Sequence, residues 1–294
     1  MSTYNTPAAE VDIDEVLVRS LLQSQFPELA RLDLTVLANG WDNVLFRLGD
    51  AMTVRMPRRE VAAQLVLNEQ RWLPLLDAQL PLPIPVPLRA GVPSPQFPWA
   101  WSVLAYVVGE AAADATYDED RVAMALGEFL AALHTPAPAD APLNLFRGVA
   151  LSDRDAVSVE RIAALANTVD VDAVACVWRN AVEVPIWSGE PVWIHGDLHP
   201  ANVVVHRGDV AAVIDFGDIT SGDPATDLSA GWMFFGPEAR RIFRNAYGND
   251  DADLWARARG NALAHSLAVL TSSGDSPRMQ AIGERTLNAV LADR

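Results

Sequence analysis

Three oxygen-bearing side chains within residues 192–218 have the types and spacing to hold a divalent cation beside a reacting hydroxyl group. Asp197 and Asn202 lie in the run HGDLHPAN, and Asp215 opens the run DFG after an apolar segment. Apolar runs alternate here with turn residues such as Gly208, which predicts a strand, a loop, a strand, a tight turn and a third strand. We therefore expect the three side chains at strand ends that face one site.

Phosphoryl transfer is the chemistry that needs such a set, because the protein must position a nucleophile and neutralise charge on the transferred group. Magnesium prefers hard oxygen ligands and keeps several waters, so Asn202 and Asp215 suffice as the metal ligands of the protein. Asp197 then accepts or orients the proton of an attacking hydroxyl as the catalytic residue. The spacing D-x-x-x-x-N followed by D-F-G matches the catalytic and metal loops of kinases.

The two motifs together resemble those of the aminoglycoside phosphotransferase family of antibiotic and small-molecule kinases. His199, at a position where protein kinases usually carry lysine, is part of this resemblance. The alternative interpretation is that HGD and DFG are ordinary turns, since glycine and aspartate favour turns. Both motifs, in the right order and on predicted strand ends, favour the family.

The resemblance covers roughly residues 34–291 and implies an α+β, protein-kinase-like bilobal fold. The expected N-lobe, residues 1–105, is an antiparallel sheet plus a helix that binds nucleotide. The expected C-lobe, residues 106–294, is mainly helical and carries the catalytic loop, the metal loop and the acceptor-binding helices. The implied cofactors are ATP, with GTP possible, and Mg²⁺.

The N-terminal third of the sequence shows the pattern of such an N-lobe. Residues 11–26 carry apolar side chains at helical spacing and predict an amphipathic helix that ends before Pro27. Three consecutive strands are expected over 34–37, 44–48 and 52–56.

The turn between the first two strands is a candidate phosphate loop. It consists of Asn39, Gly40, Trp41, Asp42 and Asn43, whose backbone N–H groups could meet the anionic oxygens of a nucleotide. The turn has one glycine and no G-x-G-x-x-G pattern, so a plain hairpin turn is the alternative.

Arg55 lies in the third expected strand, where kinases place the lysine that contacts the nucleotide phosphates and pairs with an acid on the next helix. That helix is expected over 58–76, and Glu69 is the acid nearest its middle, so we predict the pair Arg55–Glu69 as part of the nucleotide site. The run VRMPR that contains Arg55 resembles the macrolide-kinase branch of the family, which tolerates arginine here. The alternative is two solvated surface charges.

Seven prolines over residues 81–98 remove backbone donors, which predicts an extended connector rather than a core element. A buried strand is expected over 101–109 and leads into the hinge between the lobes. The backbone of Ala105, Tyr106 and Val107 would then bind the edges of the adenine base, a role that almost any side chains permit.

The C-lobe helices are expected over 120–134, in parts of 157–187, and over 237–247, 252–270 and 277–291. The run DPATDL resembles a segment of the family in which the second acid, here Asp227, braces the catalytic loop. His134 and His265 are expected to be structural histidines. Family resemblance also places the acceptor pocket near residues 232–235, Trp255 and the acids Asp250, Asp251 and Asp253, although the aromatic residues could equally be core.

Composition limits the partners. The net charge of −16 argues against nucleic acid, since phosphate binding needs a basic surface. The same charge suits a cationic acceptor, with solubility as the alternative explanation. The sequence has no run of about eighteen apolar residues that could span a membrane, and a single cysteine, Cys176, suits a reducing cytoplasm. Oligomeric state is left open.

The leading hypothesis is an O-phosphotransferase dependent on Mg²⁺ and ATP or GTP, with an aminoglycoside-like antibiotic as the first acceptor to consider. A macrolide, a sugar or another small metabolite is the alternative acceptor. A catalytically silent nucleotide-binding protein is the alternative of another class, but Asp197, Asn202 and Asp215 are all present. A protein kinase is disfavoured, because the short segment from Gly217 to Asp227 lacks an A-P-E motif.

Overall fold

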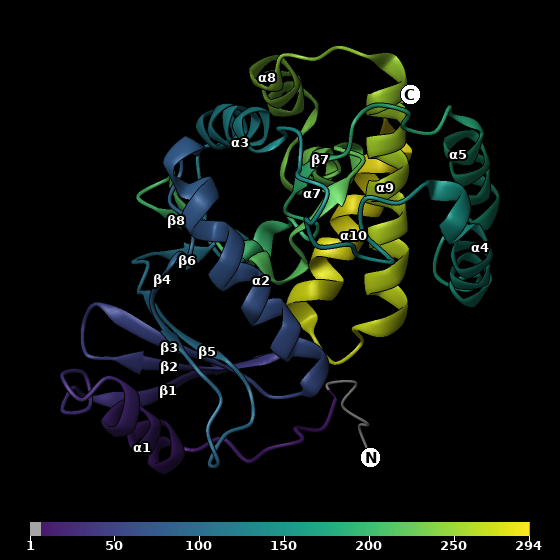
Figure 1. Cartoon of the computed structure of the whole chain (residues 1–294). Helices are drawn as coiled ribbons and strands as arrows, with labels where there is room; N and C mark the ends of the chain where they lie inside the picture. The colour runs from purple at the N-terminus through teal and green to yellow at the C-terminus, as the bar shows by residue number, and fades with distance from the viewer. Residues whose placement is uncertain (1–6, 294) are drawn as a thin grey trace.

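The computed structural model describes residues 7–293, which form two lobes of different composition (Figure 1). One lobe is built on an antiparallel sheet, and the other is mainly helical. This arrangement confirms the predicted α+β, kinase-like fold class.

The N-lobe sheet has five antiparallel strands in the order β1-β2-β3-β5-β4. The strands are β1 (Leu34–Asn39), β2 (Asn43–Leu48), β3 (Met52–Pro57), β4 (Pro87–Gly91) and β5 (Trp101–Ala105). The first three agree with the predicted strands. The strand predicted over 101–109 is shorter and ends at Ala105.

The proline-rich segment is the part of this lobe where the prediction was wrong. It contains β4, which pairs with β5, so it is more than a connector. Proline cannot donate to a strand ladder, and it is accepted at the first residue of a strand and on sheet edges. Pro87 opens β4 and β4 is an edge strand, so both conditions are met.

Two helices cover the two faces of this sheet. Helix α1 (Glu15–Gln25) is capped by Asp14, whose carboxylate accepts from the Leu17 amide at 2.8 Å, and it packs on the face that buries Val54 and Met56. Helix α2 (Glu60–Leu76) crosses the other face, toward the second lobe (Figure 1). Side chains alternate along a strand, so β3 directs Arg55 toward α2.

Several short strands carry or flank the catalytic segment. These are β6 (Glu110–Ala111), β7 (Val192–Ile194), β8 (Val203–His206), β9 (Asp209–Val213) and β10 (Thr220–Gly222). The hairpin between β8 and β9 turns through Arg207 and Gly208, both with positive φ, as a two-residue hairpin turn requires. The predicted strand, loop, strand, turn and strand are therefore present.

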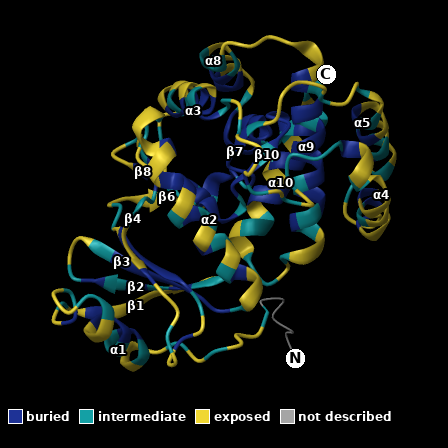
Figure 2. Ribbon diagram, viewed as in Figure 1, coloured by how far each residue is buried: buried dark blue, intermediate teal, exposed yellow. Residues whose placement is uncertain are grey.

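The C-lobe helices are α3 (Glu119–Leu133), α4 (Asp155–Ala164), α5 (Val171–Glu183), α6 (Ala225–Leu228), α7 (Ala230–Phe234), α8 (Pro237–Tyr247), α9 (Ala252–Ser272) and α10 (Pro277–Ala292). Helix α9 is largely buried and forms the centre of this lobe (Figure 2). No helix within residues 7–293 is long and apolar enough to cross a membrane.

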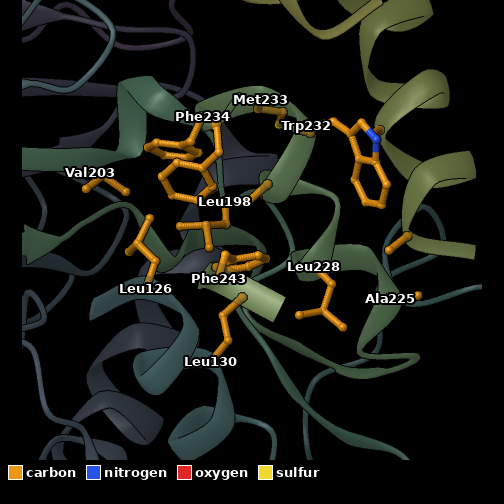
Figure 3. Packing of buried hydrophobic residues seen from close by; sticks show 14 of the residues in the cluster. Leu126, Leu130, Leu198, Val203, Ala225, Leu228, Trp232, Met233, Phe234 and Phe243 are labelled. Carbon is orange, nitrogen blue, oxygen red and sulfur yellow. The ribbon is translucent and has the colours of Figure 1, made fainter. Parts of the chain in front are cut away.

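The aromatic residues that were candidates for an acceptor pocket are core residues. Trp232, Phe234, Phe235 and Trp255 are each at most 5% exposed. Figure 3 shows Phe234 near Leu198, with Leu126, Phe243 and Leu130 beside them and Trp232 at the edge of the same cluster. Leu198 follows Asp197 directly, so this core fixes the base of the catalytic loop.

Candidate active site

One cleft of about 600 Å³ lies between the N-lobe sheet and the catalytic segment. Most of the predicted site residues line it: Gly40, Trp41, Asp42, Asn43, Arg55, Ala105, Tyr106, Val107, Asp197, Asn202 and Asp215. Asn39, at the end of β1, does not line the cleft. Glu69 lies behind Arg55, away from the cleft surface.

The catalytic loop is held in place by a buried carboxylate. Asp227 accepts from the backbone amides of His195 and Gly196 at 2.7 and 2.9 Å, and it contacts His134 Nε2 at 3.2 Å. Gly196 has φ 85°, and a Cβ there would lie 2.4 Å from the carbonyl oxygen of Asp218, so only glycine fits. These contacts agree with the predicted bracing role of Asp227 and the structural role of His134.

Both oxygens of Asp197 are engaged by donors. Arg147 Nη2 donates to Oδ1 at 2.6 Å, and His199 Nε2 and Asn202 Nδ2 approach Oδ2 at 3.3 and 3.5 Å. Burial alone would raise the pKa of Asp197, but the charges of Arg147 and His199 hold it well below its ordinary value. Asp197 is therefore an ionised carboxylate that can accept a hydrogen bond from a hydroxyl.

Asn202 and Asp215 offer hard oxygens to the same cleft. Asn202 Nδ2 donates to the carbonyl of Asp197 at 2.9 Å, and among the described residues its Oδ1 accepts no hydrogen bond. The side chain of Asp215 is 52% exposed, and within residues 7–293 only its Oδ1 is engaged, by Arg55 at 2.8 Å. One free amide oxygen and one open carboxylate are a donor set that suits Mg²⁺, which needs few ligands from the protein.

Asp215 also has an unusual backbone. Its φ of 61° puts a residue other than glycine in the left-handed region, a conformation that costs of order 1–3 kcal/mol and clusters at functional sites. The backbone carbonyl of Asn202 accepts from the amide of Ile214, the residue before Asp215, at 2.9 Å, which ties the end of β9 to the catalytic loop. The two proposed metal ligands are thereby held by one backbone contact.

Arg55 and Glu69 form the predicted pair. Arg55 Nη1 donates to Glu69 Oε1 at 2.6 Å, both side chains are almost fully buried, and Nη2 reaches Asp215. In the amide orientation that satisfies both groups, Asn43 Oδ1 also accepts from Arg55 Nε and Nη2 at 3.2 and 3.0 Å. Burial raises the pKa of the Glu69 carboxyl, and the adjacent Arg55 guanidinium opposes that rise. Glu69 thus orients Arg55 at the floor of the cleft.

The turn at residues 39–43 is more constrained than a phosphate loop requires. The Gly40 amide donates to the carbonyl of Asn43 at 2.9 Å, so it is not free for a phosphate oxygen. Arg58 Nη1 donates to the Gly40 carbonyl at 2.9 Å, and Arg59 pairs with Asp42. The Gly40 amide is therefore already engaged, and phosphate binding by this turn stays a prediction.

The hinge backbone is partly engaged as well. The Tyr106 amide donates to the carbonyl of Ala51 at 2.8 Å, and the Arg47 guanidinium lies over the Tyr106 ring. Within the described chain, the Val107 amide has no hydrogen-bond partner. Base recognition by this segment would therefore use Val107 rather than the Tyr106 amide.

Two site residues were missed at the sequence level, Arg147 and Asp218. Arg147 Nε donates to Asp218 Oδ2 at 3.1 Å, and Asn144 Nδ2 donates to Asp218 Oδ1 at 3.0 Å. Burial raises the pKa of Asp218, against the opposing charge of Arg147. Asp218 could have been found from its place directly after DFG, whereas Arg147 lies in a loop without any pattern.

The acids proposed for acceptor binding do not line the cleft. Asp250 pairs with Arg244 at 2.9 Å, and Asp251 caps α9 by accepting from the Leu254 amide at 2.6 Å. Asp253 is exposed in the first turn of the same helix. The placement of the acceptor site at these acids is therefore not supported by the structure.

Solved structures share this fold at low sequence identity. The GDP complex of aminoglycoside 2'-phosphotransferase-IIIa is 19% identical, with a TM-score of 0.73 over 96% of this chain and 100% of that chain. Macrolide 2'-phosphotransferase type I is 20% identical, with a TM-score of 0.63 over 95% and 99%. Macrolide 2'-phosphotransferase MphH from Brachybacterium faecium is 20% identical, with a TM-score of 0.61 over 93% and 98%.

Sequence comparison with curated proteins finds no match. The model of one protein family, described as the phosphotransferase enzyme family, does match, and the match extends over residues 33–260. That range includes the N-lobe sheet, the catalytic loop and the metal loop, and it exceeds half of the chain. The chain therefore belongs to the phosphotransferase enzyme family.

Proposed function

We propose that this protein transfers the terminal phosphoryl group of a nucleoside triphosphate to a hydroxyl group of a small molecule. The observation that carries the proposal is that Asp197, Asn202 and Asp215 line one cleft of about 600 Å³. These are the groups that phosphoryl transfer requires for the nucleophile and for the metal. Structural neighbours have been solved with GDP, ATP or ADP, which supports a nucleotide in the cleft.

Each group has a proposed role. Asn202 and Asp215 would hold Mg²⁺, which when bound neutralises the charge of the phosphates. Arg55, oriented by Glu69, would meet a phosphate oxygen through its planar fork. Val107 would contact the base, with ATP as the expected nucleotide and GTP as the alternative.

Asp197 acts on the acceptor and not on the nucleotide. Its carboxylate has about four lone-pair sites, so it can accept a hydroxyl proton while Arg147 and His199 remain bound. A strong base is unnecessary, because phosphoryl transfer passes through a loose transition state with little bonding to the nucleophile. Asp197 would therefore orient the hydroxyl before it takes up the proton.

The acceptor class rests on weaker support. Neighbouring structures contain kanamycin, streptomycin or gentamicin, and others are macrolide phosphotransferases. The net charge of −16 also suits a cationic acceptor. Aminoglycoside-like compounds are accordingly the first class to assay, followed by macrolides, sugars and other hydroxyl-bearing metabolites.

The lobe boundary after Ala105 and a cytoplasmic location stay predictions, the latter resting on the single Cys176.

The alternative of a silent nucleotide-binding protein would bind nucleotide without turnover. One screen distinguishes the active phosphotransferase from the silent protein. The chain is incubated with nucleoside triphosphate and each acceptor, with and without Mg²⁺. Mass spectrometry should find one acceptor that gains a phosphoryl group only with Mg²⁺, and nucleotide binding without any transfer would favour the silent protein.

A further inference from the structure

A second, smaller hollow lies on the C-lobe side of Asp197. Its volume is about 20 Å³, and its lining includes Arg147, Arg154, Asn261 and His265 as well as Asp197. A space of this size holds little more than one water-sized group. The hollow can therefore receive one polar substituent of an acceptor whose hydroxyl lies at Asp197, but not a whole antibiotic.

Arg154 is an uncompensated cation in this hollow. Among the described residues its side chain forms no hydrogen bond and no ion pair, although it is only half-exposed. Burial, together with Arg147 and Arg161, lowers the pKa of Arg154 to about 10, so the guanidinium stays charged at neutral pH. A half-buried charge without a partner is unfavourable, which makes Arg154 a ready binding group for an anion.

His265 adds an unused polar atom. Its Nε2 is buried and has no hydrogen-bond partner within residues 7–293. Burial, with His199 next in effect, lowers the pKa of His265 to about 3, so the ring is neutral and can carry a proton on Nε2. Buried polar atoms of side chains usually have a hydrogen-bond partner, so the unpaired Nε2 is available to a ligand in the hollow.

No acid in the hollow is free to neutralise Arg154. Asp197 is the one carboxylate in its lining, and both oxygens of Asp197 are engaged by Arg147, His199 and Asn202. The Ser229 hydroxyl in the lining donates to the carbonyl of Thr226 at 2.6 Å. The lining of the hollow thus carries two guanidinium groups, of which Arg147 is engaged by Asp197 and Asp218 and Arg154, within the described chain, is not paired.

We propose that the acceptor carries a carboxylate next to its reacting hydroxyl, and that Arg154, assisted by His265, binds this carboxylate. Binding there would place the hydroxyl at Asp197. This inference rests on the proposed phosphotransferase function, and it departs from the order of acceptors given there by favouring hydroxy acids over amines and neutral alcohols. If so, the residues that line the hollow, and not the net charge of the chain, determine which acceptor charge is preferred.

Three minimal probes that share a hydroxyl but differ in charge test the inference. Glycolate carries a carboxylate, glycolamide is neutral and ethanolamine carries an ammonium group. Binding is measured by ligand-observed NMR on the full chain, with Mg²⁺ and a non-hydrolysable nucleotide filling the large cleft. Glycolate should bind saturably, and glycolamide and ethanolamine should not.

Variants locate the binding. Arg154→Gln should weaken glycolate binding by roughly ten- to one-hundred-fold, because a hydrogen bond between charged groups is lost. Arg154→Lys should retain part of the glycolate binding. Arg179 is an exposed arginine on α5 outside both cavities, so Arg179→Gln should leave glycolate binding unchanged. Equal glycolate binding by the Arg154→Gln and Arg179→Gln variants, or a preference for ethanolamine, would overturn the inference.

The proposed function and this inference can fail separately. Probe binding needs no turnover, so it reports on Arg154 even if no phosphoryl transfer is found. Conversely, transfer to a neutral or aminated acceptor, with an unchanged acceptor KM in Arg154→Gln, would leave the phosphotransferase proposal intact and refute the carboxylate site.

Discussion

Arg147 joins Asp197 of the catalytic loop to Asp218, which follows the DFG motif, donating to Asp197 at 2.6 Å and to Asp218 at 3.1 Å. Its guanidinium lines both the large cleft and the small hollow. The planar fork of arginine can serve two carboxylates at once in a fixed geometry. Arg147 is therefore a positioning residue that fixes the direction in which Asp197 accepts a proton.

Arg147→Gln should lower kcat and leave the nucleotide KM nearly unchanged, because the carboxylate loses its main orienting donor. The expected loss is roughly ten- to one-hundred-fold, the size of one charge-assisted hydrogen bond. Steady-state kinetics with the best acceptor measures it. As a control, Arg121→Gln removes an exposed pair with Asp209 and should change neither parameter. A rise in nucleotide KM with constant kcat would assign Arg147 to nucleotide binding instead.

Arg55 and Glu69 should prove energetically coupled. Arg55→Lys should raise the nucleotide KM and lower kcat, since lysine offers a single point charge in place of a fork. Arg55→Ala should be worse, and Glu69→Ala should show a milder form of the same defect.

A double-mutant cycle in nucleotide binding should give an interaction energy of about 0.5–3 kcal/mol between these two residues. The 2.6 Å contact between buried side chains is the reason for this expectation. Purely additive effects of the two substitutions would show that Glu69 does not orient Arg55 during nucleotide binding.

The metal ligands can be tested by titration. Asp215→Asn and Asn202→Ala should both shift the Mg²⁺ midpoint of nucleotide binding to higher concentration, with the larger shift for Asp215→Asn because a charge is lost. Asp209→Asn, in the hairpin outside the cleft, serves as the matched control. If the midpoint stays the same in Asp215→Asn, Asp215 is not a metal ligand.

His265 should make the fold sensitive to acid. Its pKa is about 3 in the folded state, against an ordinary value of 6.5, so the unfolded chain binds a proton between these values and the folded chain does not. Stability from this group is present above the unfolded pKa and is lost as the pH falls toward 3.

Urea unfolding checks this sign. The free energy of unfolding should fall by about 2 kcal/mol more in the wild type than in His265→Asn when the pH is lowered from about 7 to about 5. Other groups titrate equally in both proteins and cancel in the difference. Equal losses in the two proteins would mean that the imidazole protonates freely in the fold.

The sequence predicted the parts of the site that have a local pattern. Arg55 and Glu69 could be paired because kinases place a cation on this strand and an acid on the next helix, and Glu69 is the acid nearest the middle of that helix. Strand β4 was not predicted, because the number of prolines in residues 81–98 does not distinguish an edge strand from a connector.

The acceptor side of the site could not be predicted in this way. Arg147 lies fifty residues before Asp197, in a loop without periodicity, and its contact exists only in the folded chain. The net charge suggested a cationic acceptor. However, Asp250 pairs with Arg244 and Asp251 caps α9, both away from the cleft. The charge that an acceptor would meet depends on tertiary packing around Asp197, which composition does not report.

The central claim is that Asp197 acts on an acceptor hydroxyl during phosphoryl transfer. The most direct measurement compares phosphoryl transfer and nucleotide binding in the wild type and in Asp197→Asn, with the same acceptor and Mg²⁺ concentration. The substitution should lower kcat by roughly a hundred- to ten-thousand-fold and leave the nucleotide Kd unchanged. Near-normal transfer by Asp197→Asn would contradict the account.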